Sequence, residues 1–158
     1  MNAKQRRVLA IVATDATFEE SRHGTDAVWV GACIHCRSPL TIGSDGRPVS
    51  EATIEHIWPQ RHGGDNALRN IALACGACNR GKGGRHDTRA KNDPRLAEIV
   101  AALRARRDER WREPPAGLAS HVSWALAAAP APGGDEAPAG SSPGTTSGSR
   151  RRGRRGPR

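Results

Sequence analysis

Short apolar runs, each bounded by polar or turn-forming residues, mark the strands expected along this chain. AVWV at 27–30 predicts one strand, ATIEHIW at 52–58 a second that ends at Pro59, and IALA at 71–74 a third. Residues 37–50 carry turn signals at Ser-Asp-Gly and at a proline, so they predict a hairpin. The polar segment RHGGDN at 61–66 predicts a loop.

Helical patterns flank these strands. The clearest covers 93–111, where Asp93 suits the N-cap and Pro94 the first helical position, and apolar residues recur on one face while arginines occupy the other. A shorter helix is expected over 76–82, ended by glycines, and another near 4–12. Strands mixed with helices predict an α+β fold.

The chain changes character after Trp111. Residues 113–158 contain seven of the eleven prolines, are rich in Ala, Gly and Ser, and end in SRRRGRRGPR. Such a segment buries too little apolar surface to offset chain entropy, so it is expected to be a disordered tail, with 121–129 forming at most a transient helix. The expected division is an N-terminal extension at 1–26, a domain at 27–112 and this tail.

Composition and charge change the picture in two ways. Aromatic residues make up only 3% of the chain, and a core that poor in large side chains usually needs a metal or disulfide to hold it together. The net charge is +9, which favours nucleic acid as a partner, although all but three of the 25 basic residues are arginine and codon bias is the alternative explanation. The basic run from Arg150 is expected to contact nucleic acid, with a solubilising tail as the alternative.

Four cysteines occur as two Cys-x-x-Cys pairs, Cys33/Cys36 and Cys75/Cys78. Four thiolates at tetrahedral positions form a closed structural zinc site. Residues 37–74 separate the pairs, more than the roughly 15–20 residues of a zinc ribbon, so the intervening chain must fold back on itself. Disulfides or a redox dithiol are the alternatives, and His35 is expected to be a bystander. Loss of zinc is expected to unfold the domain.

Polar residues in a defined order along the chain form a motif between and within the cysteine pairs. It reads Glu55-His56-Ile-Trp-Pro, then Gly-Gly, then Asn70, and ends as Cys-Asn79-Arg-Gly-Lys82. His56 is the motif's only side chain with an ordinary pKa near neutrality, so it can take a proton from water. Carboxylate and amide oxygens are ligands that Mg²⁺ and Mn²⁺ accept.

This motif resembles the HNH endonucleases, in particular the zinc-containing members of bacteria and phages, over about residues 33–83. The EHIWPQ and NRGK segments are similar to the HNH domain of RNA-guided CRISPR nucleases. The resemblance implies a ββα-metal (His-Me finger) fold held together by the zinc site. It also implies a DNA endonuclease that leaves 5′-phosphate and 3′-hydroxyl ends.

Roles for individual residues follow from the same resemblance. His56 would be the general base, Glu55 and Asn79 would hold a catalytic Mg²⁺ or Mn²⁺, and Asn70 would fix the loop and the orientation of the histidine. Many members have Asp before the histidine where this chain has Glu55. The basic residues expected to contact DNA phosphates are Arg61, Arg69, Arg80 and Lys82. His62 is expected to be a solvated loop residue.

Two other functions stay open. One is a zinc-containing DNA-binding module whose nuclease motif has decayed, and the other is a secreted nuclease toxin. The apolar run at 8–13 is too short for a signal peptide or a membrane span, which disfavours the toxin and predicts the cytoplasm of a bacterial or phage-infected cell. Small size favours a phage origin, and neither the oligomeric state nor the sequence specificity can be inferred.

Overall fold

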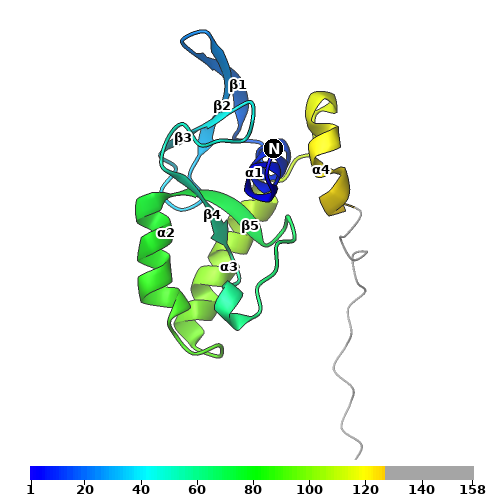
Figure 1. Cartoon of the computed structure of the whole chain (residues 1–158). Helices are drawn as coiled ribbons and strands as arrows, with labels where there is room; N and C mark the ends of the chain where they lie inside the picture. Colours follow the sequence, from blue (N-terminus) through cyan, green and yellow to red (C-terminus); the bar gives the residue numbers. More distant parts are fainter. Residues whose placement is uncertain (127–158) are drawn as a thin grey trace, which may run out of the picture.

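The computed structural model describes residues 1–126 and shows a mixed α+β fold, as the sequence predicts (Figure 1). Three strands, β1 (Glu19–His23), β2 (Asp26–Ala32) and β3 (Pro39–Gly43), form one antiparallel sheet in the order β1-β2-β3. Strands β4 (Ala52–His56) and β5 (Ile71–Cys75) form a second antiparallel sheet, in which Glu55 faces Ala72. The basic tail from Arg150 lies outside the described residues.

Four helices accompany the sheets within residues 1–126. They are α1 (Ala3–Thr14), α2 (Gly76–Lys82), α3 (Pro94–Glu109) and α4 (Ala119–Leu126), with a π-helical turn at Gly83–Asp87 directly after α2 and short 3₁₀ turns at Gln60–His62 and Ala116–Leu118. The β4-β5-α2 unit has the ββα order that the motif predicts. Helix α2 has the predicted bounds, with Gly83 as its C-cap, and the π-helical turn at Gly83–Asp87 follows it directly.

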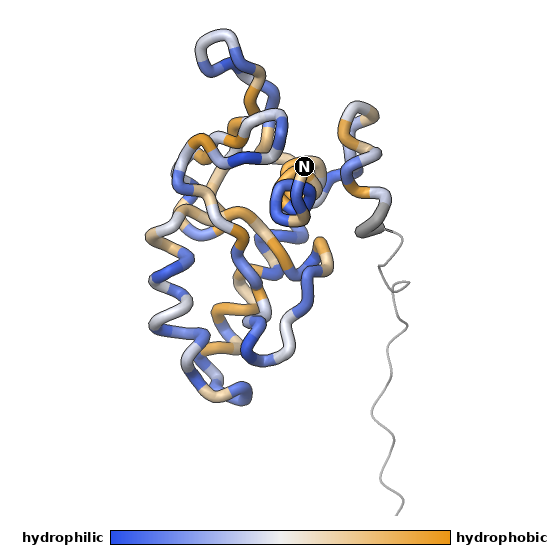
Figure 2. The backbone as a smooth tube through the Cα atoms, in the orientation of Figure 1, coloured by the Kyte–Doolittle hydropathy of each residue, from blue (hydrophilic) through white to orange (hydrophobic). Residues whose placement is uncertain are grey.

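Helix α1 begins with a reciprocal cap and then enters the core. The Asn2 side chain accepts a hydrogen bond from the Gln5 backbone N–H, and the Gln5 side chain accepts one from the Asn2 backbone N–H. From Val8 to Thr14 every residue is buried, and Figure 2 shows this apolar helix beside the two sheets. The segment expected to be a mere extension therefore supplies a large part of the core.

Two arginines, one in α3 and one just after it, bind the C-terminal end of α1. The buried Arg107 donates to the backbone carbonyls of Leu68 and Thr14 and to the Thr14 hydroxyl, at 3.2, 3.0 and 2.6 Å. Arg112 donates to the carbonyls of Val12 and Ala13. Burial lowers the pKa of Arg107 to about 10, so it stays charged near neutrality. An arginine that the sequence assigns to the solvent face of α3 thus joins α1, α3 and the loop before β5.

Several predicted boundaries differ from the structure. The hairpin expected at 37–50 is reduced to β3, which pairs with β2, and to a single bridge between Ile42 and Pro48. The predicted strand at 52–58 ends at His56. The start of the expected disordered tail is helical: the 3₁₀ turn that contains Leu118 and the helix α4 that contains Val122 both pack on α1, and both side chains are buried. Residues 127–158 are outside the described part.

Candidate active site and zinc site

The four cysteines converge on one point. The Sγ atoms of Cys33, Cys36, Cys75 and Cys78 all lie within 4.8 Å of one another, and none is in a disulfide. Four sulfurs around one zinc at about 2.3 Å stand about 3.8 Å apart, and the Cys36 and Cys75 sulfurs are already separated by 3.9 Å. The donor set and its spacing fit a tetrahedral zinc site.

The surroundings of the thiols differ in their effect on acidity. Hydrogen bonding to the hydroxyl and backbone of Ser38 lowers the pKa of Cys36 to about 6. Burial raises the pKa of Cys33, and burial together with the neighbouring Cys75 raises the pKa of Cys78 to about 12. Near neutrality, therefore, at least two of the four ligands carry protons that a metal would displace.

The zinc site is connected to α3 and to strand β4. Arg106 donates to the carbonyls of Ile34 and His35 at 3.3 Å, and Arg110 donates to the Ala32 carbonyl at 2.9 Å. The ring of His35, inside the first cysteine pair, lies with Nε2 2.9 Å from Glu55 Oε2. His35 is not part of the four-sulfur group, as expected, but its side chain joins the zinc loop to the strand that carries the motif.

Glu55 lies inside the protein with both oxygens engaged. Its side chain is 1% exposed, Oε2 faces His35, and Oε1 is 2.8 Å from the ammonium of Lys82, which is itself 2% exposed. Lys82 Nζ also donates to Asp87 Oδ1 at 2.7 Å and to the His56 carbonyl at 2.9 Å. This placement makes Lys82 the centre of a buried ion-pair cluster, so it is not exposed for the DNA phosphate contact expected from the sequence.

A cleft of about 290 Å³ brings the ends of β4 and α2 together. Glu55, His56, Asn79 and Asp87 are among the residues that line it, and Arg61 stands at the same cleft. Asn79 donates its amide N–H groups to the Thr53 hydroxyl at 2.9 Å and to the Ile54 carbonyl at 3.2 Å. These two bonds fix α2 against β4 and leave the amide oxygen of Asn79 available to a ligand.

His56 is half-buried at the end of β4. Its Nε2 is 3.1 Å from Oδ1 of Asn66, and no hydrogen bond to its Nδ1 is found in the described part of the chain. One ring nitrogen is thereby held by the protein, while the other is free for a water molecule. The sequence did not single out either Asn66 or Asp87, because neither belongs to the recognised motif.

The HNH endonuclease family model matches residues 33–85, which include both cysteine pairs and all of β4, β5 and α2. Residues 33–85 are called the HNH domain below, after the family model that they match. No curated protein and no solved structure matches the chain. The match points to nuclease activity.

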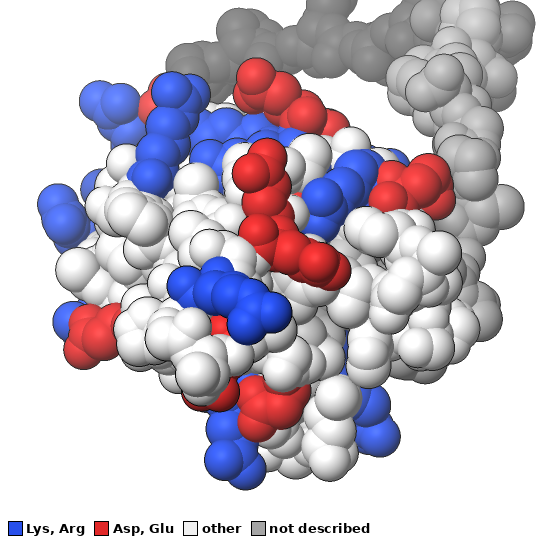
Figure 3. All heavy atoms as spheres, turned by 90° about the horizontal axis from the view of Figure 1, so that it is seen from above, with Lys and Arg blue, Asp and Glu red and all other residues white. Residues whose placement is uncertain are grey.

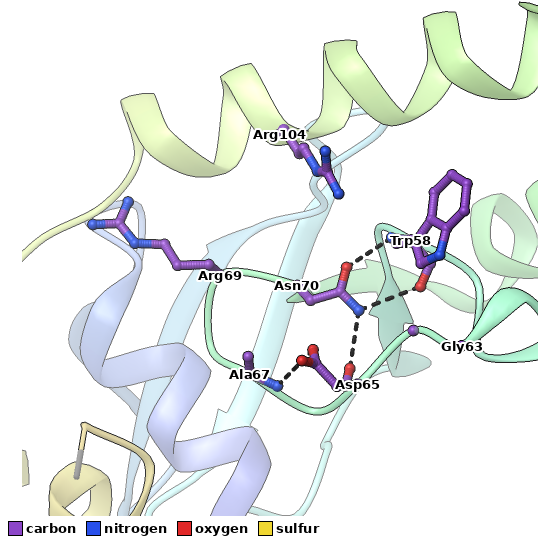
Figure 4. A pocket seen from close by; sticks show the side chains of 8 residues that line it. Trp58, Gly63, Asp65, Ala67, Arg69, Asn70 and Arg104 are labelled. Carbon is purple, nitrogen blue, oxygen red and sulfur yellow. Dashed lines mark hydrogen bonds between the residues drawn. The ribbon is translucent and has the colours of Figure 1, made fainter. Parts of the chain in front are cut away.

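Asn70 holds the long loop of the HNH domain rather than touching His56. Its side-chain oxygen accepts from the Trp58 N–H at 2.8 Å, and its amide donates to the carbonyls of Trp58 and Asp65 at 3.3 and 2.9 Å (Figure 4). These bonds fix both ends of the segment between Trp58 and Asp65. Gly64 lies against that segment, because a Cβ there would stand 1.9 Å from the Trp58 carbonyl oxygen.

The expected DNA contacts of the HNH domain differ in their placement. Arg61 lines the cleft, whereas Arg80 is exposed, 3.9 Å from Glu51. Arg69 pairs with Asp108 at 2.8 Å and lies over the ring of Trp111. Figure 3 shows basic and acidic side chains interspersed on one face, so the positive charge is not gathered into a single patch there.

His62 is not a free loop residue either. Its Nε2 lies 3.1 Å from the Arg89 carbonyl, and its ring is 5.9 Å from that of Trp58. These contacts place it in the packing of the HNH loop. None of the helices within residues 1–126 is long and apolar enough to cross a membrane.

Proposed function

We propose that this protein is a metal-dependent DNA endonuclease that hydrolyses phosphodiester bonds and leaves 5′-phosphate and 3′-hydroxyl ends. The observation that carries the proposal is the cleft of the HNH domain, where the imidazole of His56 stands beside the oxygen donors of Asn79, Glu55 and Asp87. A base and a set of hard oxygen ligands at one cleft are what this hydrolysis requires.

His56 acts on the attacking water. The unbonded Nδ1 accepts a proton from the water as its oxygen attacks the phosphorus, and the bond from phosphorus to the 3′ oxygen breaks. The departing 3′ oxygen takes a proton from solvent, so the products are a 5′-phosphate and a 3′-hydroxyl. The backbone carbonyl of His56, held by Lys82, keeps the end of β4 in place during the step.

The donor set fits a hard divalent cation, Mg²⁺ or Mn²⁺. Such a cation, when bound, polarises the phosphate and stabilises the charge on the departing oxygen. Asn79 and Glu55 are the proposed ligands, and Asp87 offers a further carboxylate at the same cleft. Within the described residues, the only group of three or more Cys, His, Asp or Glu ligand atoms is that of the four cysteines. The cleft therefore offers a divalent cation few protein ligands, and water would complete its coordination, as is usual for Mg²⁺.

Arg61 is the proposed phosphate contact nearest to the chemistry, because it lines the cleft. Arg69 and Arg80 remain proposed phosphate contacts, although neither lines the cleft. Lys82 is left out, since its ammonium is buried and paired with two carboxylates.

A plasmid-cutting assay tests the proposal. Zinc-loaded full-length protein is dialysed free of other metals and mixed with supercoiled plasmid while Mg²⁺ or Mn²⁺ is titrated. This design avoids a chelator, which would remove the structural zinc as well. Cutting that depends on the added cation and disappears in His56→Ala is expected.

The matched control is His23→Ala, which removes an exposed histidine from β1. It should cut like the wild type. Nicks that DNA ligase seals without prior kinase treatment would verify the proposed ends. Equal cutting by wild type and His56→Ala, or no cutting at any cation concentration, would contradict the proposal.

One observation favours the alternative, a DNA-binding module with a decayed site. Both oxygens of Glu55 already have partners inside the protein, so this carboxylate must share one of them to hold a cation. DNA binding by wild type and His56→Ala with cutting by neither would support this alternative.

A further inference from the structure

The loop before β5 brings an asparagine to the ring of His56. Asn66 Oδ1 lies 3.1 Å from His56 Nε2, and the same oxygen lies 3.4 Å from Nη1 of Arg7, which comes from α1. Arg7 is outside the segment that matches the HNH family. Arg7 of the N-terminal helix is therefore linked to His56 through the side chain of Asn66.

The two contacts together determine what each atom does. A guanidinium only donates, so the atom of Asn66 that faces both groups must be its carbonyl oxygen. An oxygen in that position accepts from His56, which requires the proton of the neutral ring to be on Nε2. The lone pair is then on Nδ1.

The backbone on either side of Asn66 is also held. The Asp65 carbonyl accepts from the Asn70 amide at 2.9 Å, and the Asp65 carboxylate accepts from the Ala67 N–H at 3.1 Å. Figure 4 shows these two bonds of Asp65, which hold the backbone next to Asn66 in place. This support allows a single side-chain bond to define the ring orientation.

We propose that Asn66 is a positioning residue for His56, fixing the tautomer whose Nδ1 takes the proton, and that Arg7 holds Asn66 in the required orientation. The proposal rests on the function proposed above. It also gives α1 a part in cutting that its burial alone does not describe.

The first test measures the ring itself, without cutting. Nitrogen NMR of ¹⁵N-histidine-labelled, zinc-loaded full-length protein at about pH 8.5, where an imidazole of ordinary pKa is neutral, reports which nitrogen carries the proton. His56 is assigned by its absence in His56→Ala. The wild type is expected to show the Nε2–H form, and Asn66→Ala is expected to show a mixture of both tautomers.

The second test measures rate and affinity separately. Asn66→Ala is expected to lower kcat about 10- to 100-fold, the usual effect of losing a partner behind a functional histidine, with KM for plasmid changed less than about twofold. Asn66→Asp keeps an acceptor oxygen at the same point and should restore kcat. Arg7→Ala should give a smaller loss of kcat in the same direction, and Asn92→Ala, which removes an exposed asparagine from another loop, should change neither quantity.

The outcomes separate this inference from the proposed function. An Nδ1–H tautomer in the wild type, or the same tautomer in wild type and Asn66→Ala, would overturn the positioning role whether or not the protein cuts DNA. Absence of cutting in the wild type would contradict the proposed function alone, and the NMR result would still decide the tautomer. If Asn66→Ala fails to fold by circular dichroism, Asn66→Asp and Arg7→Ala carry the comparison.

Discussion

Replacement of Lys82 by methionine tests the buried ion-pair cluster. The substitution keeps most of the side-chain volume and removes the ammonium, which lies 2.8 Å from Glu55 Oε1 and 2.7 Å from Asp87 Oδ1. The carboxylate of Glu55 is 1% exposed and would keep only His35 as a partner. The methionine therefore leaves an uncompensated negative charge inside the domain.

The expected cost is large relative to the stability of the fold. Breaking a buried ion pair from one side costs about 3–5 kcal/mol, because the remaining charge stays away from water. A whole domain is stable by about 5–15 kcal/mol, so Lys82→Met should fold only marginally. Adding Glu55→Gln removes the uncompensated charge and is expected to recover part of the loss, giving a non-additivity of more than about 1 kcal/mol.

Urea unfolding of the zinc-loaded protein, followed by circular dichroism, measures this free energy. The control is Arg80→Met, since the Arg80–Glu51 pair is 3.9 Å long and both side chains are mostly exposed; its effect should stay within about 0.5 kcal/mol. A Lys82→Met variant as stable as the Arg80→Met control, with the same urea dependence, would refute the reasoning.

Two further predictions concern the zinc site and the long loop. Burial raises the pKa of Cys33 and of Cys78, so zinc must displace a proton from each thiol when it binds. The affinity for zinc should therefore rise from neutrality upward by at least about two log units per pH unit. Titration calorimetry in buffers of different ionisation enthalpy counts the released protons, and a count below two would contradict the assignment. Gly64→Ala should destabilise the protein by about 1–3 kcal/mol in urea unfolding, because its Cβ meets the Trp58 carbonyl, whereas Gly84→Ala has open space and should not; equal stability of the two variants would speak against this packing.

The parts of the fold that depend on local chemistry could be predicted from the sequence. Asp93 and Pro94 define the start of α3, and the apolar runs define β4 and β5. The two cysteine pairs predict one metal site with a folded insertion between them, and the structure brings the four sulfurs together. Each of these signals depends either on a few neighbouring residues or on the fixed number of ligands that a structural zinc site needs.

The polar interior could not be predicted in the same way. Lys82 and Arg107 have the sequence context of solvated basic residues, yet both are buried, because their partners are carboxylates and backbone carbonyls supplied by distant segments. The contact between His35 and Glu55 arises only when the zinc loop meets β4. Pattern along the chain reports which residues are apolar, but not which charged residues will find a partner that offsets their burial.

The tail boundary illustrates a second limit. Proline and alanine content after Trp111 predicted disorder from residue 113 onward, but Leu118 and Val122 are buried in a short helical segment that packs on α1. Average composition over a long segment conceals two apolar residues at its start. Their burial depends on the presence of α1, which composition does not report.

The burial of α1 has a consequence for how this protein can vary through evolution. The HNH segment is continuous in the chain, but Ile11 of α1 and Leu103 of α3 belong to the same core cluster as its strand β5. Selection for an intact nuclease site would therefore constrain positions that carry none of its chemistry. A chimera that exchanges only residues 33–85 with another HNH protein is therefore expected to be less stable, because its new core residues would meet α1 and α3 helices that did not evolve with them.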